Sequence, residues 1–144
     1  MPSFEERFSS ALHNTARSWR LAVDRRLKDL GMSQASWMTV AIVAKAKAPL
    51  AQIELAQKVG VEGATMVAML DRLEKAGLVE RQASETDRRV KLVALTRAGA
   101  KLYDKVQTEA HAVRKTILVG VDPKLLQTAT DLLEQIQAQV EGLE

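Results

Sequence analysis

The sequence predicts a mainly α-helical protein with one small β-hairpin. Long stretches place apolar residues every three or four positions, as amphipathic helices do, and one short stretch after Gly77 changes to β-like runs. The chain has 144 residues, of which 47% are hydrophobic and 27% are charged, which is typical of a single folded domain. We expect the order helix, helix, helix, helix, hairpin, helix, helix.

The first two helices are predicted from residue 4 to residue 46. Residues 4–30 contain no Gly or Pro, and their apolar side chains recur at intervals of three, four and seven. Gly31 ends this helix. Ser33 is a suitable N-cap for a second helix over residues 34–46, which should be buried because it is nearly all apolar.

Two short helical patterns follow at residues 52–59 and 62–76, and Gly60-Val61 separates them. These lengths and this break are typical of a helix-turn-helix. We expect the following apolar residues to face inward: Ile53, Leu55, Ala56 and Val59 in the first helix, and Val67, Leu70 and Leu73 in the second.

The β-like runs at residues 78–81 and 90–95 are joined by the polar segment 82–89. This connection is too long for a tight turn, so the hairpin should carry an exposed loop. A helix-turn-helix followed by such a hairpin predicts a winged helix-turn-helix.

Two further helices are expected after the hairpin. Thr96 should cap a helix that runs to about residue 119, and Asp122 followed by Pro123 should begin the last one, which ends near residue 143.

The long terminal helices have apolar faces and no core of their own to cover. A second copy of the chain is the simplest cover for them, so we expect a homodimer. The winged helix-turn-helix at residues 33–97 would then lie between dimerisation helices at residues 1–32 and 98–144, within one integrated domain. The alternative is that these helices fold back on their own winged unit.

Three segments together resemble the MarR family. They are LAQIELAQKVGV at residues 50–61, LDRLEKAGLVER at 70–81 and DRRVKLVALT at 87–96. The last has the D-x-R pattern at Asp87 and Arg89, with Leu95-Thr96 at the family spacing. Residues between Trp19 and Trp37 resemble the SlyA-like branch. The resemblance implies a transcriptional regulator that binds double-stranded DNA. Because a homodimer has a two-fold axis, we expect its operator to be an AT-rich pseudo-palindrome.

The second helix of the helix-turn-helix is the candidate for the major groove. Its expected outward residues are small or flexible, which lets a helix approach base edges. Thr65 can contact a phosphate or a base, Arg72 a phosphate or guanine, and Ala68 and Met69 a thymine methyl group. The alternative is an ordinary solvated face. Glu62 departs from the family pattern, in which a Ser or similar small cap often opens this helix. Its carboxylate suits the helix dipole but repels phosphate.

The hairpin is the candidate for the minor groove, whose negative potential attracts arginine. By resemblance, Arg89 is the favoured minor-groove residue and Asp87 braces the wing, while Arg88 could share or take over the role of Arg89. A solvated charge run is the alternative. Residues 81–97 hold only two acidic residues, Glu85 and Asp87, and a larger number of basic ones, an excess that we expect on an exposed loop: Arg81, Arg88, Arg89, Lys91 and Arg97.

A small-molecule ligand is a further hypothesis. Relatives of this kind commonly respond to small aromatic carboxylates, which would release this protein from DNA. The resemblance places Arg17, Trp19, Arg20 and Trp37 near such a site, and two arginines beside two tryptophans could hold an aromatic acid by charge and stacking. The alternative is that Arg20 pairs with Asp24 and Trp37 belongs to the core.

Several functions are not expected. The chain contains no Cys, which excludes disulfides and thiol-based redox switches, and His13 and His111 are not spaced as a metal site. No catalytic motif is present, so we expect neither an enzyme nor a cofactor. There is no run of 18 apolar residues and no secretory signal, so we expect a cytoplasmic protein at the nucleoid, away from membranes. A winged helix that binds proteins is the main competing class, but it would not need basic residues on the hairpin.

Overall fold

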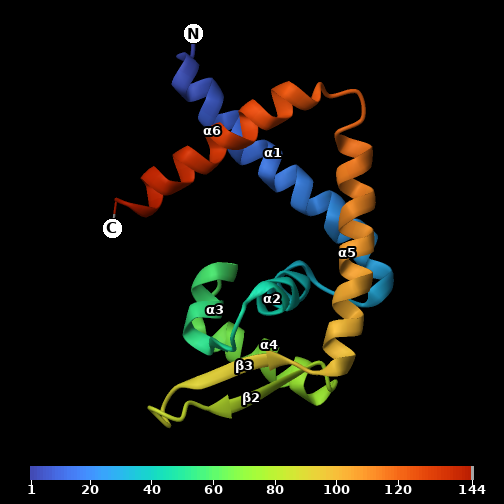
Figure 1. Cartoon of the computed structure of the whole chain (residues 1–144), viewed down its shortest axis with the longest axis vertical. Helices are drawn as coiled ribbons and strands as arrows, with labels where there is room; N and C mark the ends of the chain where they lie inside the picture. The colour runs from blue at the N-terminus through green and yellow to red at the C-terminus, as the bar shows by residue number, and fades with distance from the viewer. Residues whose placement is uncertain (144) are drawn as a thin grey trace. The chain divides into compact units, whose positions relative to one another are not determined.

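The computed structural model describes residues 1–143 (Figure 1). The chain forms α1 (Phe4–Leu27), the 3₁₀ turn η1 (Lys28–Leu30), α2 (Gln34–Lys45), β1 (Leu50–Ala51), α3 (Gln52–Val59), α4 (Gly63–Lys75), β2 (Val79–Ala83), β3 (Lys91–Leu95), α5 (Arg97–Ile117) and α6 (Pro123–Glu141). This order confirms the predicted fold class. The chain divides into one compact unit of residues 1–113 and a second that begins at Arg114.

Helix α1 begins with a capping box. The Ser3 hydroxyl accepts from the backbone N–H of Glu6 at 3.2 Å, and the Glu6 carboxylate accepts from the N–H of Ser3 at 2.8 Å. The helix ends one turn earlier than predicted, because the chain tightens into η1, where the Gly31 N–H donates to the Lys28 carbonyl at 2.9 Å. Gly31 has φ 72°, which glycine adopts without strain.

Strand β1 was not predicted. Its two residues pair with β3, Leu50 opposite Val93 and Ala51 opposite Leu92, and give a three-stranded antiparallel sheet in the order β1-β3-β2. Two residues between Pro49 and a helix are too short to show a β period. The pairing joins the start of α3 to the hairpin.

The inward face of α4 differs from the prediction. Met66, Met69, Leu70 and Leu73 are buried, whereas Val67 is 37% exposed. The expected outward position of Met69 is therefore wrong. The reason is the helix period: Met66, Met69, Leu70 and Leu73 are spaced i, i+3, i+4, i+7, so they form one continuous apolar stripe, and Val67 lies beside it. In α3, Ile53 is likewise exposed (67%), while Leu55 and Ala56 are buried.

Helix α2 lies behind this stripe. Thr39, Val40 and Val43 are its buried residues, its last residue Lys45 is exposed, and its other side chains are partly covered. The buried hydroxyl of Thr39 donates to the Ala35 carbonyl at 2.7 Å and lies 3.3 Å from the sulfur of Met69. This contact places Met69 in the core between α2 and α4.

The base of the hairpin packs against the start of α5. The Thr96 hydroxyl donates to the Gly77 carbonyl and accepts from the Gly99 N–H at 3.1 Å, as expected of a cap. Gly99 is buried, and a Cβ there would overlap the carbonyl oxygen of Leu78. Only glycine fits this close approach.

In the second unit, α6 begins as predicted. Asp122 accepts from the Lys124 N–H at 2.9 Å, and Pro123 occupies the first turn. The helix buries no residue, and Leu125, Leu126, Leu132, Leu133 and Val140 are exposed.

Candidate DNA interface

The exposed face of α4 holds three of the four residues of this helix that were predicted to contact DNA. Thr65, Ala68 and Arg72 are exposed and spaced i, i+3, i+7, so they lie on one side of the helix. Met69 does not belong to this face, since it is 3% exposed and packs inward. Lys75, which the sequence reasoning missed, is exposed in the last turn of the same helix.

The first turn of α4 is open. Glu62 is the N-cap residue, but its side chain makes no capping hydrogen bond, and Gly63 and Ala64 are exposed. The first N–H groups of the helix therefore have no side-chain acceptor here. This end carries the positive end of the helix dipole.

The loop between β2 and β3 projects from the end of the hairpin (Figure 1) and carries exposed basic residues. Arg88 and Arg89 in the loop and Lys91 at the start of β3 are all exposed, and the side chain of Arg89 is 91% exposed. The Ser84 N–H donates to the Val90 carbonyl at 2.8 Å, which extends the pairing of the two strands to the base of the loop.

Asp87 holds Arg89 by both its backbone and its side chain. The N–H of Arg89 donates to Oδ1 of Asp87 at 3.0 Å, and its guanidinium donates to Oδ1 at 3.1 Å and to Oδ2 at 3.3 Å. These bonds favour the charged carboxylate and hold the pKa of Asp87 below its ordinary value, the side-chain bond contributing most. The geometry is compatible with the bracing role that the resemblance implied.

Arg81 differs from the other basic residues of the hairpin. The sequence reasoning counted it in the basic excess of an exposed loop, which is wrong: its side chain is only 17% exposed and bonds to Asp71, Glu74 and Gln52. A signal was present in the strand period, because Arg81 is two residues from the buried Val79 and so shares its face.

The candidate ligand residues lie on α1 and α2. Arg17 and Arg20 are exposed, while Trp19 and Trp37 are partly buried and pack against the core. The indole N–H of Trp37 is buried and has no hydrogen-bond partner. A cavity of about 390 Å³ is lined by none of these four candidate residues. Its lining includes Leu30, Ser33, Ser36, Met69, Arg72 and Leu102.

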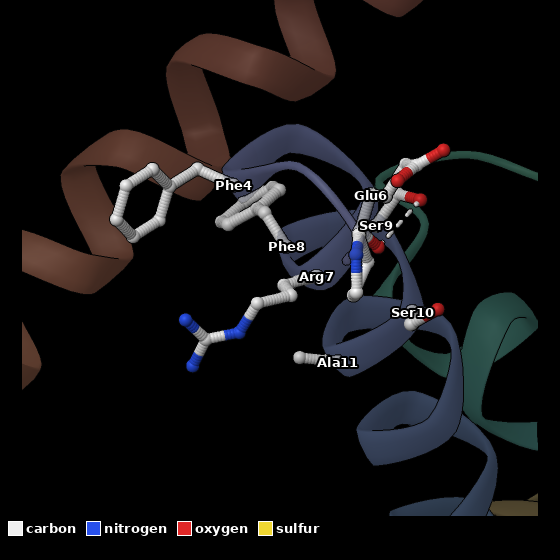
Figure 2. A pocket seen from close by; sticks show the side chains of 8 residues that line it. Phe4, Glu6, Arg7, Phe8, Ser9, Ser10 and Ala11 are labelled. Carbon is white, nitrogen blue, oxygen red and sulfur yellow. Dashed lines mark hydrogen bonds between the residues drawn. The ribbon is translucent and has the colours of Figure 1, made fainter.

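The start of α1 carries a hollow lined by its own side chains. Figure 2 shows Phe4, Phe8 and Arg7 extending to one side of the helix and Glu6, Ser9 and Ser10 to the other. Phe4 is 83% exposed, and its ring lies 5.8 Å from the Arg7 guanidinium carbon. These aromatic rings form an exposed apolar surface.

No helix within residues 1–143 is long and apolar enough to cross a membrane. The same residues contain no group of three or more His, Cys, Asp or Glu side chains that could hold a metal ion.

The arrangement of α2, α3, α4 and a β2–β3 hairpin defines a winged helix-turn-helix protein. The MarR family profile matches residues 32–91, which span α2 to the start of β3. The crystal structure of transcriptional regulator PA3341 is 40% identical over 94% of this chain and 98% of that one, with a TM-score of 0.85. The chain belongs to the MarR family, and this family and its structural relatives are transcriptional regulators.

Two more distant structures share the fold. The crystal structure of the transcriptional regulator SlyA is 19% identical over 92% of this chain and 93% of that one, with a TM-score of 0.78. CouR from Rhodococcus jostii RHA1, solved with p-coumaroyl-CoA, is 22% identical over 94% of this chain and 95% of that one, with a TM-score of 0.77. At these identities the likeness extends to the fold alone.

Proposed function

We propose that this regulator binds double-stranded DNA sequence-specifically, with α4 in the major groove and the hairpin loop in the adjacent minor groove. The observation that carries the proposal is that α4 has an exposed face of mostly small side chains and that an exposed basic loop lies on the same compact unit. In this arrangement Thr65, Ala68 and Arg72 read the major groove, and Arg88, Arg89 and Lys91 bind at the minor groove. A winged helix that binds proteins would gain nothing from these three exposed charges.

The regulator acts as a homodimer, as proposed from the sequence, with residues 1–32 and 98–144 as dimerisation helices around the DNA-binding region 33–97. The support is the apolar surface left uncovered in a single chain, at Phe4 and Phe8 in α1 and on α6. Exposed leucine and phenylalanine in such numbers are typical of a surface that another chain covers. A two-fold axis then requires a pseudo-palindromic operator with half-sites ~10 bp apart.

Selection of duplexes from a random pool tests both statements. The purified protein should enrich one pseudo-palindromic sequence, and sedimentation should give a dimer at micromolar concentration. Enrichment of no sequence would refute DNA recognition. A folded monomer, or a single asymmetric half-site, would refute the dimer.

The regulator is of the SlyA-like type and is released from DNA by a small aromatic carboxylate. CouR is a member of this fold that was solved with an aromatic acyl thioester, and the chain offers two candidate places for an acid. One is the group Arg17, Trp19, Arg20 and Trp37. The other is the cavity of about 390 Å³, where Arg72 is the cationic residue among mostly apolar side chains and two serines, Ser33 and Ser36.

Calorimetry with salicylate distinguishes these places. Loss of binding in Arg20→Ala but not in Arg72→Ala would assign the acid to α1, and the reverse would assign it to the cavity. No heat with the wild-type protein, together with unchanged DNA affinity at millimolar salicylate, would refute release by this class of ligand.

A further inference from the structure

Arg81 joins three elements of the DNA-binding region. From β2 its guanidinium donates to Glu74 of α4 at 2.9 and 3.2 Å, to Asp71 of α4, and to the side-chain oxygen of Gln52 in α3 at 3.3 Å. Its backbone N–H donates to the second oxygen of Glu74 at 3.0 Å. One residue of the hairpin is therefore bonded to both helices of the helix-turn-helix.

The guanidinium of Arg81 is not available to DNA. All three of its nitrogens already donate to protein oxygens, and only 17% of the side chain is exposed. Its single charge faces the two carboxylates of Asp71 and Glu74. A bidentate bond to phosphate or guanine needs two parallel N–H donors, and Arg81 has no such pair left.

Because Arg81 lies near the loop end of the hairpin, a small change in its position would move the loop. Arg81 pairs with the buried Val93, and only two further residue pairs follow in the ladder, the last of them Ala83 with Lys91. A strand rises ~3.3 Å per residue, so Asp87, six residues further on, lies up to ~20 Å away, and a tilt of ~10° at Arg81 would displace it by up to ~3.5 Å. That displacement exceeds the length of a hydrogen bond.

We propose that Arg81 is a positioning residue for DNA binding: through Glu74, Asp71 and Gln52 it fixes the hairpin against α3 and α4, so that the loop and α4 reach one duplex together. It does so without touching the DNA. This inference rests on the proposed function, because it needs both elements to bind DNA.

The first test asks whether removing a negative charge strengthens or weakens DNA binding. The probe is a duplex that the wild-type protein has selected from a random pool. Glu74→Met removes a negative charge near DNA, so a charge effect alone would strengthen binding. Positioning predicts the opposite, about tenfold weaker binding, because Arg81 loses its main acceptor. Glu80→Met is the matched control, because Glu80 is an exposed acidic residue on β2, next to Arg81. Its replacement should leave DNA binding equal or tighter. Tighter binding by Glu74→Met would overturn the proposal.

A double-mutant cycle gives the second test. If Arg81 places the loop, replacing both Arg88 and Arg89 by Ala should cost about tenfold less in an Arg81→Met background than in the wild type, because the loop is already misplaced. If Arg81 contacts DNA itself or only stabilises the fold, the two losses will multiply, and this result would overturn the proposal. The slope of affinity against salt should fall in Arg81→Met by as much as in the loop variant.

Arg81→Lys covers the case in which Arg81→Met does not fold. Lysine keeps the charge but cannot span Glu74, Asp71 and Gln52 at once, so binding should still weaken although the net charge is unchanged. Wild-type affinity for this variant would overturn the proposal. A wild-type protein that selects no duplex would instead refute the proposed function, before any variant is compared.

Discussion

Replacement of Arg89 by Ala is the most direct test of the hairpin loop. The side chain is 91% exposed and bonds to Asp87, so its removal takes away no packing and should leave the dimer and the melting temperature unchanged. A good arginine contact to DNA is worth ~1 to 3 kcal/mol. Because Arg89 is already paired with Asp87, binding DNA exchanges one charged contact for another, and we expect the lower end of that range.

The expected loss is therefore ~1 kcal/mol at each hairpin loop, or ~2 kcal/mol for a dimer on its operator, which weakens binding by about 30-fold. Fluorescence anisotropy with the selected duplex across a salt series measures this loss. The salt slope should also decrease by up to ~0.9 for each phosphate-equivalent charge removed.

Two companion variants make the result interpretable. Asp87→Asn should weaken binding by releasing the loop while keeping every positive charge, so its salt slope should change less than that of Arg89→Ala. Arg88→Ala removes the neighbouring arginine, which is also exposed. Full affinity of Arg89→Ala with a large loss in Arg88→Ala would move the contact to Arg88, and full affinity of the double variant would refute the insertion of the loop into DNA.

Three predictions concern the scaffold. Met69→Ala should lower the free energy of unfolding by ~2 to 5 kcal/mol, whereas Val67→Ala, on the exposed flank of α4, should cost well under 1 kcal/mol in chemical denaturation; equal losses would contradict the core position of Met69. Gly99→Ala should cost at least ~3 kcal/mol, because its Cβ overlaps the Leu78 carbonyl; a wild-type melting curve would contradict this close approach. The pKa of Glu74 lies below its ordinary 4.5, chiefly because the Arg81 side chain donates to it, so this contact stabilises fully above that pH and is lost as the pH falls through the lowered value. Melting temperatures of the wild type and Glu74→Gln should therefore differ at neutral pH and converge in strong acid.

The order of the helices could be predicted because several boundaries carry a local chemical signal. Ser33, Asp122-Pro123 and Gly31 act through caps and backbone conformation that depend on a few neighbouring residues. Strand β1 could not be predicted, since its two residues are strands only because β3 lies beside them. The unit boundary inside α5, near Val113, leaves no signal in the sequence either.

The candidate interface was predicted less evenly, and Met69 shows why. Its side chain is apolar enough for either a core or a thymine methyl contact, and the sequence reasoning gave the inward position to Val67. The helix period favours the stripe that contains both Met66 and Met69, and the hydroxyl of Thr39 on α2 completes the pocket around the sulfur. A partner 30 residues away in the chain cannot be read from local spacing.

Arg81 and Arg89 show how burial separates two arginines that the sequence presents alike. Both lie in the same hairpin, and both bond to a carboxylate. Arg89 has one acidic partner two residues away and is almost fully exposed, so DNA can compete for it at little cost. Arg81 has two acidic partners and an amide on other elements and is itself largely covered, so a contact with DNA would break three contacts and disconnect the hairpin from α3 and α4. Although both arginines form ion pairs, the exposed Arg89 is therefore a candidate DNA contact, and the covered Arg81 is a candidate for holding the hairpin in place.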